Sequence, residues 1–394
     1  MASATLSRWT RRYLVVAVVC LALAGVAVAL GAPRRTEVAL GLYGFVLTTA
    51  FGKAYTLVPS YFDRTLVVPQ LPAVHLPIQV VAVAALAAAP IRGAPAALDV
   101  VGPVAWGLGV AVFAGTVLAT IATNPLGRET ATSESKADRA ALDRLANPFM
   151  PVALGYLLVG SYAMLAPAAG LPALIDGVVV RSTHLLAAGF ALLLLFSVGY
   201  RLLPRFLVAN LPTALAGPVL VAGAVAPALL ALGYPAGVVF QAGAALESLA
   251  VVGFAVSYGW LFFSTDRDRV GFYGPMAGVV LGLGGVVLGV WFAFVGIDGG
   301  LVRSHLRLNV VGLLGLSVLG VIYQFYPPAV SAWPGEGDRL ALASIALVAA
   351  GVVLAALEPV AGAVLAMVGG GSIAVGGGIA GYLLLGTIRT RTTR

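Results

Sequence analysis

Hydrophobic and polar positions in this chain come in long blocks, without the short periods that mark soluble helices or strands. Apolar runs of about 20 residues follow one another with short polar segments between them. A helix of that length crosses the ~30 Å hydrocarbon layer of a bilayer. The pattern predicts twelve transmembrane helices, at roughly 12–32, 38–62, 73–92, 97–123, 148–170, 178–204, 213–233, 236–263, 272–296, 302–327, 338–357 and 360–386.

The composition excludes an ordinary soluble globular protein. Hydrophobic residues make up 60% of the chain and charged residues 10%, with a mean hydropathy of +1.02, whereas soluble domains carry ~25% charged residues. Pro-Arg-Arg follows the first apolar run where a signal peptide would have a small-residue cleavage site, so this run is interpreted as a retained helix. We expect an all-α integral membrane protein that forms a single polytopic domain, residues 1–394.

The basic residues predict an orientation. If both termini are cytoplasmic, sixteen Lys and Arg residues fall on the cytoplasmic side and six on the outside. This asymmetry agrees with the positive-inside rule. The net charge of +8 is then explained by topology, and a nucleic-acid partner is not expected because the basic residues do not gather on one soluble face. The predicted location is the cell membrane, with both termini cytoplasmic.

The longest polar insert, "NPLGRETATSESKADRAALDRLAN" at 124–147, fits a cytoplasmic loop between the fourth and fifth spans. It is either a plain solvated connection or a mobile loop that binds a partner. The single cysteine, Cys20, lies in the first apolar run and cannot form a disulfide within the chain.

A three-residue pattern repeats along the chain. Gly, ten residues, Tyr, three residues and Pro recur in the second, sixth and tenth spans, four spans apart. The pattern predicts three units of four helices, with Gly at a close helix contact, Tyr at the cytoplasmic interface and Pro at the helix end. We expect the three motif helices to pack around the centre. The motif residues are Gly44, Tyr55 and Pro59, then Gly189, Tyr200 and Pro204, then Gly312, Tyr323 and Pro327, in units of roughly 12–123, 148–233 and 236–327, with 338–386 completing the bundle.

Two of the motif helices share a polar preamble, "IDGVVVRSTHLLAAG" at 175–189 and "IDGGLVRSHLRLNVVG" at 297–312. Each preamble has an Asp five residues before an Arg, which is interpreted as a clasp of charge-assisted hydrogen bonds. Each also has a histidine, His184 or His305, at the outer end of its span. His75 opens the third span from the cytoplasmic side, so a bilayer separates it from the other two. The clasp residues are Asp176 with Arg181 and Asp298 with Arg303.

These segments resemble the His-bearing helices of the haem–copper oxidase subunit I superfamily, in particular the short subunit-I-like and NnrS-type membrane proteins. The resemblance implies twelve helices in three pseudo-symmetric groups of four, with metal ligands near the outer side. It implies a haem, taken as b-type, whose iron is bound by His184 and His305 or by one of them with a distal partner. It also implies that Arg181 and Arg303 neutralise the haem propionates, a role that guanidinium groups suit.

The ligand set departs from the family pattern. A haem–copper centre needs more histidines than the three in this chain, and the predicted seventh helix, 213–233, has none. Glu37 takes the place in the second span that His305 has in the tenth. A copper centre is therefore not expected, which argues against oxygen or nitric oxide reduction. The alternative for His184 and His305 is an interfacial role, capped by carbonyls or water, and His75 is interpreted as an interfacial or packing residue.

The sequence leaves three hypotheses. The first is a haem-binding redox or gas-responsive membrane protein of respiratory or nitric-oxide-related metabolism, working beside other membrane or redox subunits. The second is a metal-free scaffold subunit, and the third is a transporter on the same fold; whether the chain is an enzyme stays open. Ionisable residues within spans are costly unless paired. Those in this chain are Lys53, Glu247, which either relays protons or is structural, and Arg307, while Glu358 is expected to lie in an outer turn.

Overall fold

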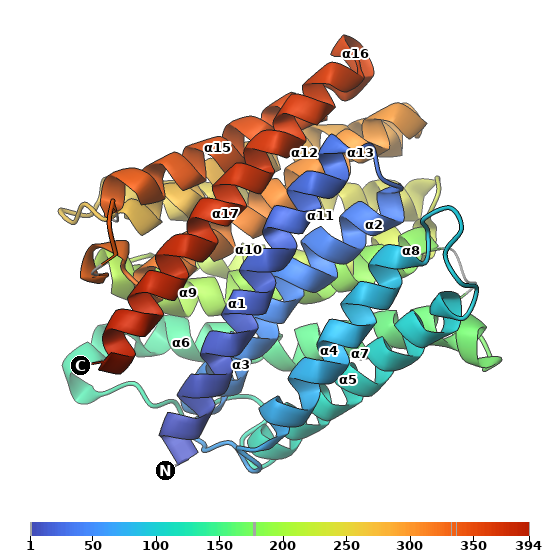
Figure 1. The fold of residues 1–394 in the computed structure, drawn as a ribbon. Helices are drawn as coiled ribbons and strands as arrows, with labels where there is room; N and C mark the ends of the chain where they lie inside the picture. The colour runs from blue at the N-terminus through green and yellow to red at the C-terminus, as the bar shows by residue number, and fades with distance from the viewer. Residues whose placement is uncertain (1, 176–178, 332, 336, 394) are drawn as a thin grey trace. The chain divides into compact units, whose positions relative to one another are not determined.

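A computed structural model describes residues 2–175, 179–331, 333–335 and 337–393, and every regular element within these ranges is a helix (Figure 1). The labels α and η denote α-helices and the shorter 3₁₀ or π segments. The elements are α1 (Ala2–Ala29), α2 (Arg34–Val38), η1 (Ala39–Leu47), α3 (Thr48–Tyr61), α4 (Leu71–Ala88), α5 (Leu98–Ile121), η2 (Glu134–Arg139), α6 (Ala140–Ala146), α7 (Phe149–Ala169), α8 (Val179–His184), η3 (Leu185–Leu192), α9 (Leu193–Leu207), α10 (Thr213–Gly233), α11 (Val238–Phe263), η4 (Val270–Phe272), α12 (Tyr273–Phe294), α13 (Gly299–Arg307), η5 (Leu308–Leu316), α14 (Ser317–Phe325), η6 (Pro328–Val330), α15 (Asp338–Ala356), α16 (Glu358–Ala361) and α17 (Ala363–Thr393).

Twelve helices in the described ranges are long and apolar enough to cross a membrane. Several are built from consecutive elements: α2, η1 and α3 form one span, Arg34–Tyr61. The twelve predicted spans are thus confirmed as helices of suitable length and composition, which indicates an integral membrane protein in contact with lipid. The fifth begins earlier than predicted, at Lys136, because the end of the polar insert is itself helical.

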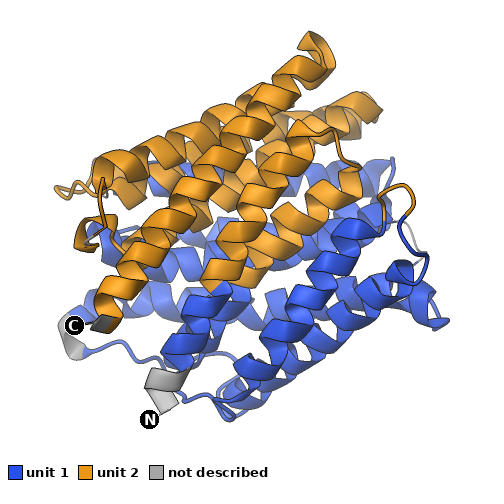
Figure 2. Ribbon diagram, viewed as in Figure 1, with its two compact units in different colours: residues 1–13, 50–89, 94–261 blue, residues 14–49, 90–93, 262–394 orange. Residues whose placement is uncertain are grey.

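The chain divides into two compact units, coloured separately in Figure 2. Unit 1 comprises residues 1–13, 50–89 and 94–261, and unit 2 comprises 14–49, 90–93 and 262–394. Each unit is described below by itself. The first motif helix contributes its N-terminal part, up to Thr49, to unit 2 and its C-terminal part, from Ala50, to unit 1.

Each motif helix contains a π-helical segment, and each segment includes the motif glycine. Gly44 lies in η1, Gly189 in η3 and Gly312 in η5. Well under 1% of residues in globular proteins are π-helical, so the same rare feature at the same motif position supports the repeat relation. The sequence patterns did not predict this widening of the helix.

In unit 2, the π segments of two motif helices pack directly against each other. A Cβ atom at Gly41 of η1 would lie 3.2 Å from Val310 of η5, and one at Gly315 of η5 would lie 3.4 Å from Phe45 of η1. Small residues therefore permit the close approach of these two helices, although they are not the motif glycines for which the sequence predicted such a contact.

In unit 1, the C-terminal part of the first motif helix packs against the second motif helix. The rings of Phe51 in α3 and Phe190 in η3 are stacked with centroids 5.9 Å apart. Gly189 accommodates Tyr156 of α7, because a Cβ atom there would lie 2.5 Å from the Tyr156 Cγ atom. The first motif helix thus contacts one motif helix in each unit, while the arrangement of all three around a common centre stays a prediction.

The motif tyrosines do not act as the predicted interfacial anchors. All three are buried, at 1–3% exposure, and each phenol oxygen is hydrogen-bonded to a side chain of another helix. A buried phenol needs such a partner, so the motif Tyr fixes how neighbouring helices align. The pairs are Tyr55 with His75 at 3.0 Å, Tyr200 with Ser257 at 3.1 Å and Tyr323 with Ser344 at 3.0 Å.

The close contact at the motif glycine Gly189 predicts that alanine substitution there affects stability differently from alanine substitution at Gly155, a glycine of the helix α7 that packs against it. Gly189→Ala should lower the free energy of unfolding by about 1–3 kcal/mol, because the new methyl group overlaps Tyr156. Gly155→Ala in α7, where nothing lies within 4 Å of the added Cβ, should be neutral or stabilising by about 0.5–1 kcal/mol. Unfolding titrations in mixed detergent micelles measure both, and equal effects would contradict the packing described.

Candidate functional site

His305 lies in the last turn of α13, three residues before the π segment η5 begins, and packs against α12 in unit 2. Its Nδ1 atom lies 2.9 Å from the carbonyl oxygen of Gly285. The ring occupies a notch where α12 has no side chain, since a Cβ at Gly289 would lie 3.3 Å from the His305 Cε1 atom. Phe292 meets the imidazole edge-on, with ring centroids 5.5 Å apart. Two glycines and one aromatic ring thus fix the orientation of this half-buried side chain.

His184 has a corresponding place in unit 1, at the end of α8 and directly before η3. Its Nδ1 atom lies 2.9 Å from the carbonyl oxygen of Val180, one turn earlier in the same helix. A carbonyl oxygen only accepts hydrogen bonds. In His184 the Nδ1 atom must therefore carry the hydrogen, which leaves the lone pair of the neutral ring on Nε2. In His305 the Nδ1 atom lies 2.9 Å from the Gly285 carbonyl oxygen and 3.3 Å from the amide nitrogen of Asn309, which is a donor, and the shorter contact to the carbonyl favours the same tautomer. This is the tautomer that binds a metal through Nε2.

The structure places the predicted site residues in two groups. His184 and Arg181 belong to unit 1, and His305 and Arg303 belong to unit 2. The pairing of the two histidines across one haem therefore stays a prediction. Within the described ranges, no three His, Cys, Asp or Glu side chains lie close enough together to share a metal ion.

The two arginines assigned to propionates already contact protein oxygens. Arg181 donates from Nη2 to the carbonyl oxygen of Tyr234 at 2.8 Å. Arg303 lies 3.5 Å from a carboxylate oxygen of Glu37 and donates to the carbonyl of Ala32 at 3.4 Å. Both arginines are half-buried, so each guanidinium keeps contact with the surface of its unit.

The predicted clasp takes another form. The carboxylate of Asp298 accepts a hydrogen bond from the backbone nitrogen of Leu301 at 3.0 Å and so caps the start of α13. The partner carboxylate of Arg303 is Glu37. Asp176, the predicted partner of Arg181, lies outside the described residues.

A buried ionic cluster in unit 2 surrounds Arg307. The guanidinium donates two hydrogen bonds to Glu37, each 3.0 Å long, and one of 2.5 Å to Glu358. Arg307 and Glu37 are 1% and 3% exposed, and Arg303 adds a second positive charge beside Glu37. Two carboxylates and two guanidinium groups thus balance in charge. Glu358 lies in the turn between the last two spans, as expected, and is 27% exposed, and its pairing with Arg307 makes it part of this cluster, hereafter the Arg307 cluster.

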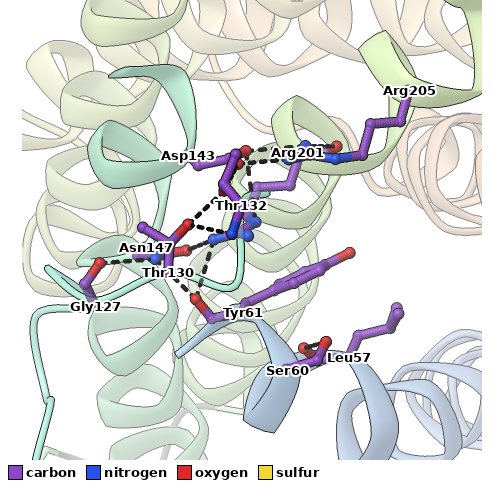
Figure 3. A network of polar contacts seen from close by, with 10 residues as sticks. All are labelled: Leu57, Ser60, Tyr61, Gly127, Thr130, Thr132, Asp143, Asn147, Arg201 and Arg205. Atoms are coloured by element: carbon purple, nitrogen blue, oxygen red, sulfur yellow. Dashed lines mark hydrogen bonds and ion pairs between the residues drawn. The ribbon is translucent and has the colours of Figure 1, made fainter. Parts of the chain in front are cut away.

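Unit 1 has a comparable cluster around Asp143, drawn in Figure 3. Arg205 donates two hydrogen bonds to the fully buried carboxylate of Asp143, at 2.9 and 2.5 Å. Arg201 lies 3.6 Å from the same carboxylate, donates to the side chain of Asn147 at 2.5 Å and stacks over the ring of Tyr61. A buried acid is thereby compensated by two cations, as burial of charge requires.

The Asp143 cluster also ties down the long polar insert, 124–147. Thr132 donates to Asp143 at 2.5 Å, and the Asn147 amide donates to the carbonyl of Gly127 at 2.9 Å. The insert is therefore anchored to the fold at both ends, and a role in binding a partner stays a prediction. No local sequence pattern marks this cluster, because its members are polar residues of ordinary spacing that meet only in the folded chain.

His75 is a fully buried packing residue, in agreement with its interpretation from the sequence. Its Nδ1 atom pairs with the Tyr55 hydroxyl, and its ring packs among aromatic side chains. A Cβ at Gly109 would lie 3.3 Å from Nε2, so the helix backbone closes off that side. The surrounding rings are Tyr13, Phe51, Tyr55 and Phe113, with centroids 5.1–5.9 Å from the imidazole.

Comparison of the chain with protein-family models and with curated proteins found no match. The residues themselves define two half-buried imidazoles with metal-binding tautomers and two self-compensated ionic clusters. The first feature can bind a metal or cofactor, and the second stabilises the bundle.

The Asp143 cluster predicts a large difference between a buried and an exposed ion pair. Asp143→Asn should lower the free energy of unfolding by about 3–5 kcal/mol, because two guanidinium groups lose their buried counter-charge. Glu129→Gln, which breaks the exposed pair with Arg64, should cost about 0–1 kcal/mol. Unfolding titrations of both variants test this, and a cost for Asp143→Asn no larger than for Glu129→Gln would be the opposing result.

Proposed function

We propose that this chain is a haem-binding integral membrane protein, a divergent relative of haem–copper oxidase subunit I, in respiratory or nitric-oxide-related metabolism. His184 and His305 are the candidate axial ligands. The observation that supports the proposal is a shared contact: a backbone carbonyl oxygen 2.9 Å from Nδ1 favours, in each ring, the tautomer with the lone pair on Nε2.

The donor set fits a haem iron better than a bare metal ion. Imidazole is a common axial ligand of haem, and one or two histidines suffice, whereas a free divalent ion takes more ligands than these two rings supply. When bound, the haem would supply a redox centre or a gas-binding iron. His184 and His305 would hold it, each fixed in orientation by its carbonyl partner.

The arginines beside the histidines are assigned to the haem propionates. Arg181 and Arg303 each lie two or three residues before a candidate ligand on the same helix. A propionate would share Arg303 with Glu37, which already lies 3.5 Å from its guanidinium. Such sharing is compatible with the five donors of an arginine side chain.

The positive-inside asymmetry supports an orientation with both termini cytoplasmic in the cell membrane. In that orientation, α8 and α13, which carry the two histidines, lie at the outer ends of their spans. The proposed haem would therefore lie near the outer surface of the membrane.

A second candidate function is a metal-free scaffold subunit. The Arg307 cluster favours it, because Arg303, one of the two arginines needed for propionates, already has a carboxylate partner within the protein. A scaffold would use the same fold and the same clusters without any pigment.

An absorption spectrum of the purified protein separates the two functions. The haem proposal predicts a Soret band, with pyridine haemochrome analysis giving the haem type. His305→Ala and His184→Ala should each abolish or shift that band, because each removes a candidate Nε2 ligand.

The matched control is His75→Gln, which should leave the band unchanged since His75 is packed among aromatic rings away from both candidate ligands along the chain. A colourless protein, even after haem is supplied, would exclude the haem proposal and leave the scaffold function. A band that survives both alanine variants would reject these two ligands.

A further inference from the structure

Glu247 is an acidic residue in the middle of a membrane-crossing helix of unit 1. It is the tenth residue of α11, which has 26 residues. At 1.5 Å per residue it lies about 14 Å from the helix start, near the middle of a ~30 Å hydrocarbon layer. No turn or helix end is close enough to bring its carboxyl group to water.

The carboxyl group is not compensated as the other buried acids are. Its Oε2 atom is buried and has no hydrogen-bond partner in the described part of the chain. Asp143 and Glu37, in contrast, each have two arginines beside them. An ionised carboxylate without a partner in apolar surroundings is strongly disfavoured, so these surroundings favour the neutral acid.

Among the described residues of the elements packed against α11, no cation acts on Glu247 at this level. Tyr156 of α7 is near enough to interact electrostatically with Glu247, and its hydroxyl donates to the carbonyl of Ala224 in α10. Helix α10 has no ionisable side chain. The titratable residues of α9 are Tyr200, Arg201 and Arg205. Tyr200 is hydrogen-bonded to Ser257 of α11, which is ten residues, or about 15 Å along the helix, from Glu247. Tyr258 of α11 lies at the same distance.

We propose that Glu247 is a proton-binding site within the membrane, where the carboxyl group takes up and releases a proton while the fold stays intact. The side chain is half-buried, so part of it faces the surface of unit 1. The site is independent of the proposed haem. It differs from Glu37 and Asp143, which are ion-paired with arginine.

Labelling with a lipid-soluble carbodiimide tests the proposal. The protonated carboxyl group adds across one C=N bond of the reagent: its proton goes to nitrogen, its oxygen bonds to carbon, and the adduct rearranges to an N-acylurea with no leaving group. Peptide mass spectrometry of the full chain in bilayers should find one reagent added at Glu247. Labelling should fall as the pH is raised from about 5 to about 9, because the ionised form has no proton to transfer.

Two sets of controls define the outcome. Glu247→Gln should abolish the label, and Glu37 and Asp143 should stay unlabelled because their carboxylate oxygens are already bonded to arginine. Infrared difference spectra provide a second readout, in which a protonated carboxyl band should titrate with pH in the wild-type chain and be missing in Glu247→Gln. If that band is absent at every pH, or if band and label both persist unchanged across the range, Glu247 does not exchange a proton and the proposal is wrong.

Discussion

A charged or polar group inside an apolar helix bundle must find its partner within the protein, since the lipid around it offers none. The Arg307 cluster satisfies this constraint in unit 2 by placing one guanidinium between two carboxylates from distant parts of the chain. The Asp143 cluster satisfies it in unit 1 in the opposite sense, with one carboxylate beside two arginines. The helices that carry these residues are thereby fixed in relative position, and the candidate histidines are fixed with them.

The same constraint explains the three repeated motifs. Each motif helix widens into a π segment around its glycine, and each places a buried tyrosine hydroxyl against a polar side chain of a neighbouring helix. Glycine allows the neighbouring helix to approach, and the hydroxyl pair determines the alignment of the two helices. The second and third copies pair Tyr with Ser, and the first pairs Tyr55 with His75, which accounts for the burial of this histidine.

The sequence predicted the spans because hydrophobicity is a local property that a run of 20 residues records directly. It predicted the motif helices because the Gly, Tyr and Pro spacing is also local. It could not predict the pairing of Glu37 with Arg307, since these residues are 270 positions apart and neither shows its partner. The π segments and the cap formed by Asp298 were likewise missed, because both depend on backbone conformation and not on residue type alone.

The site was predicted in part. The sequence selected His184 and His305 by their place before the motif glycines, and the structure gives both the same ring tautomer. It assigned Arg303 to Asp298, whereas the folded chain brings Glu37 to that guanidinium. Local spacing thus identified the residues that carry the chemistry, and long-range packing decided their partners.

A double-mutant cycle on Glu37 and Arg307 tests most directly whether internal charge pairing holds the bundle together. Glu37→Leu and Arg307→Met should each lower the free energy of unfolding by about 3–5 kcal/mol, because each leaves a buried charge uncompensated. The double variant keeps Arg303 and Glu358, which still balance in charge. It should therefore lose less than the sum of the single variants, by about 1–3 kcal/mol. Additive losses, within about 0.5 kcal/mol, would contradict the account.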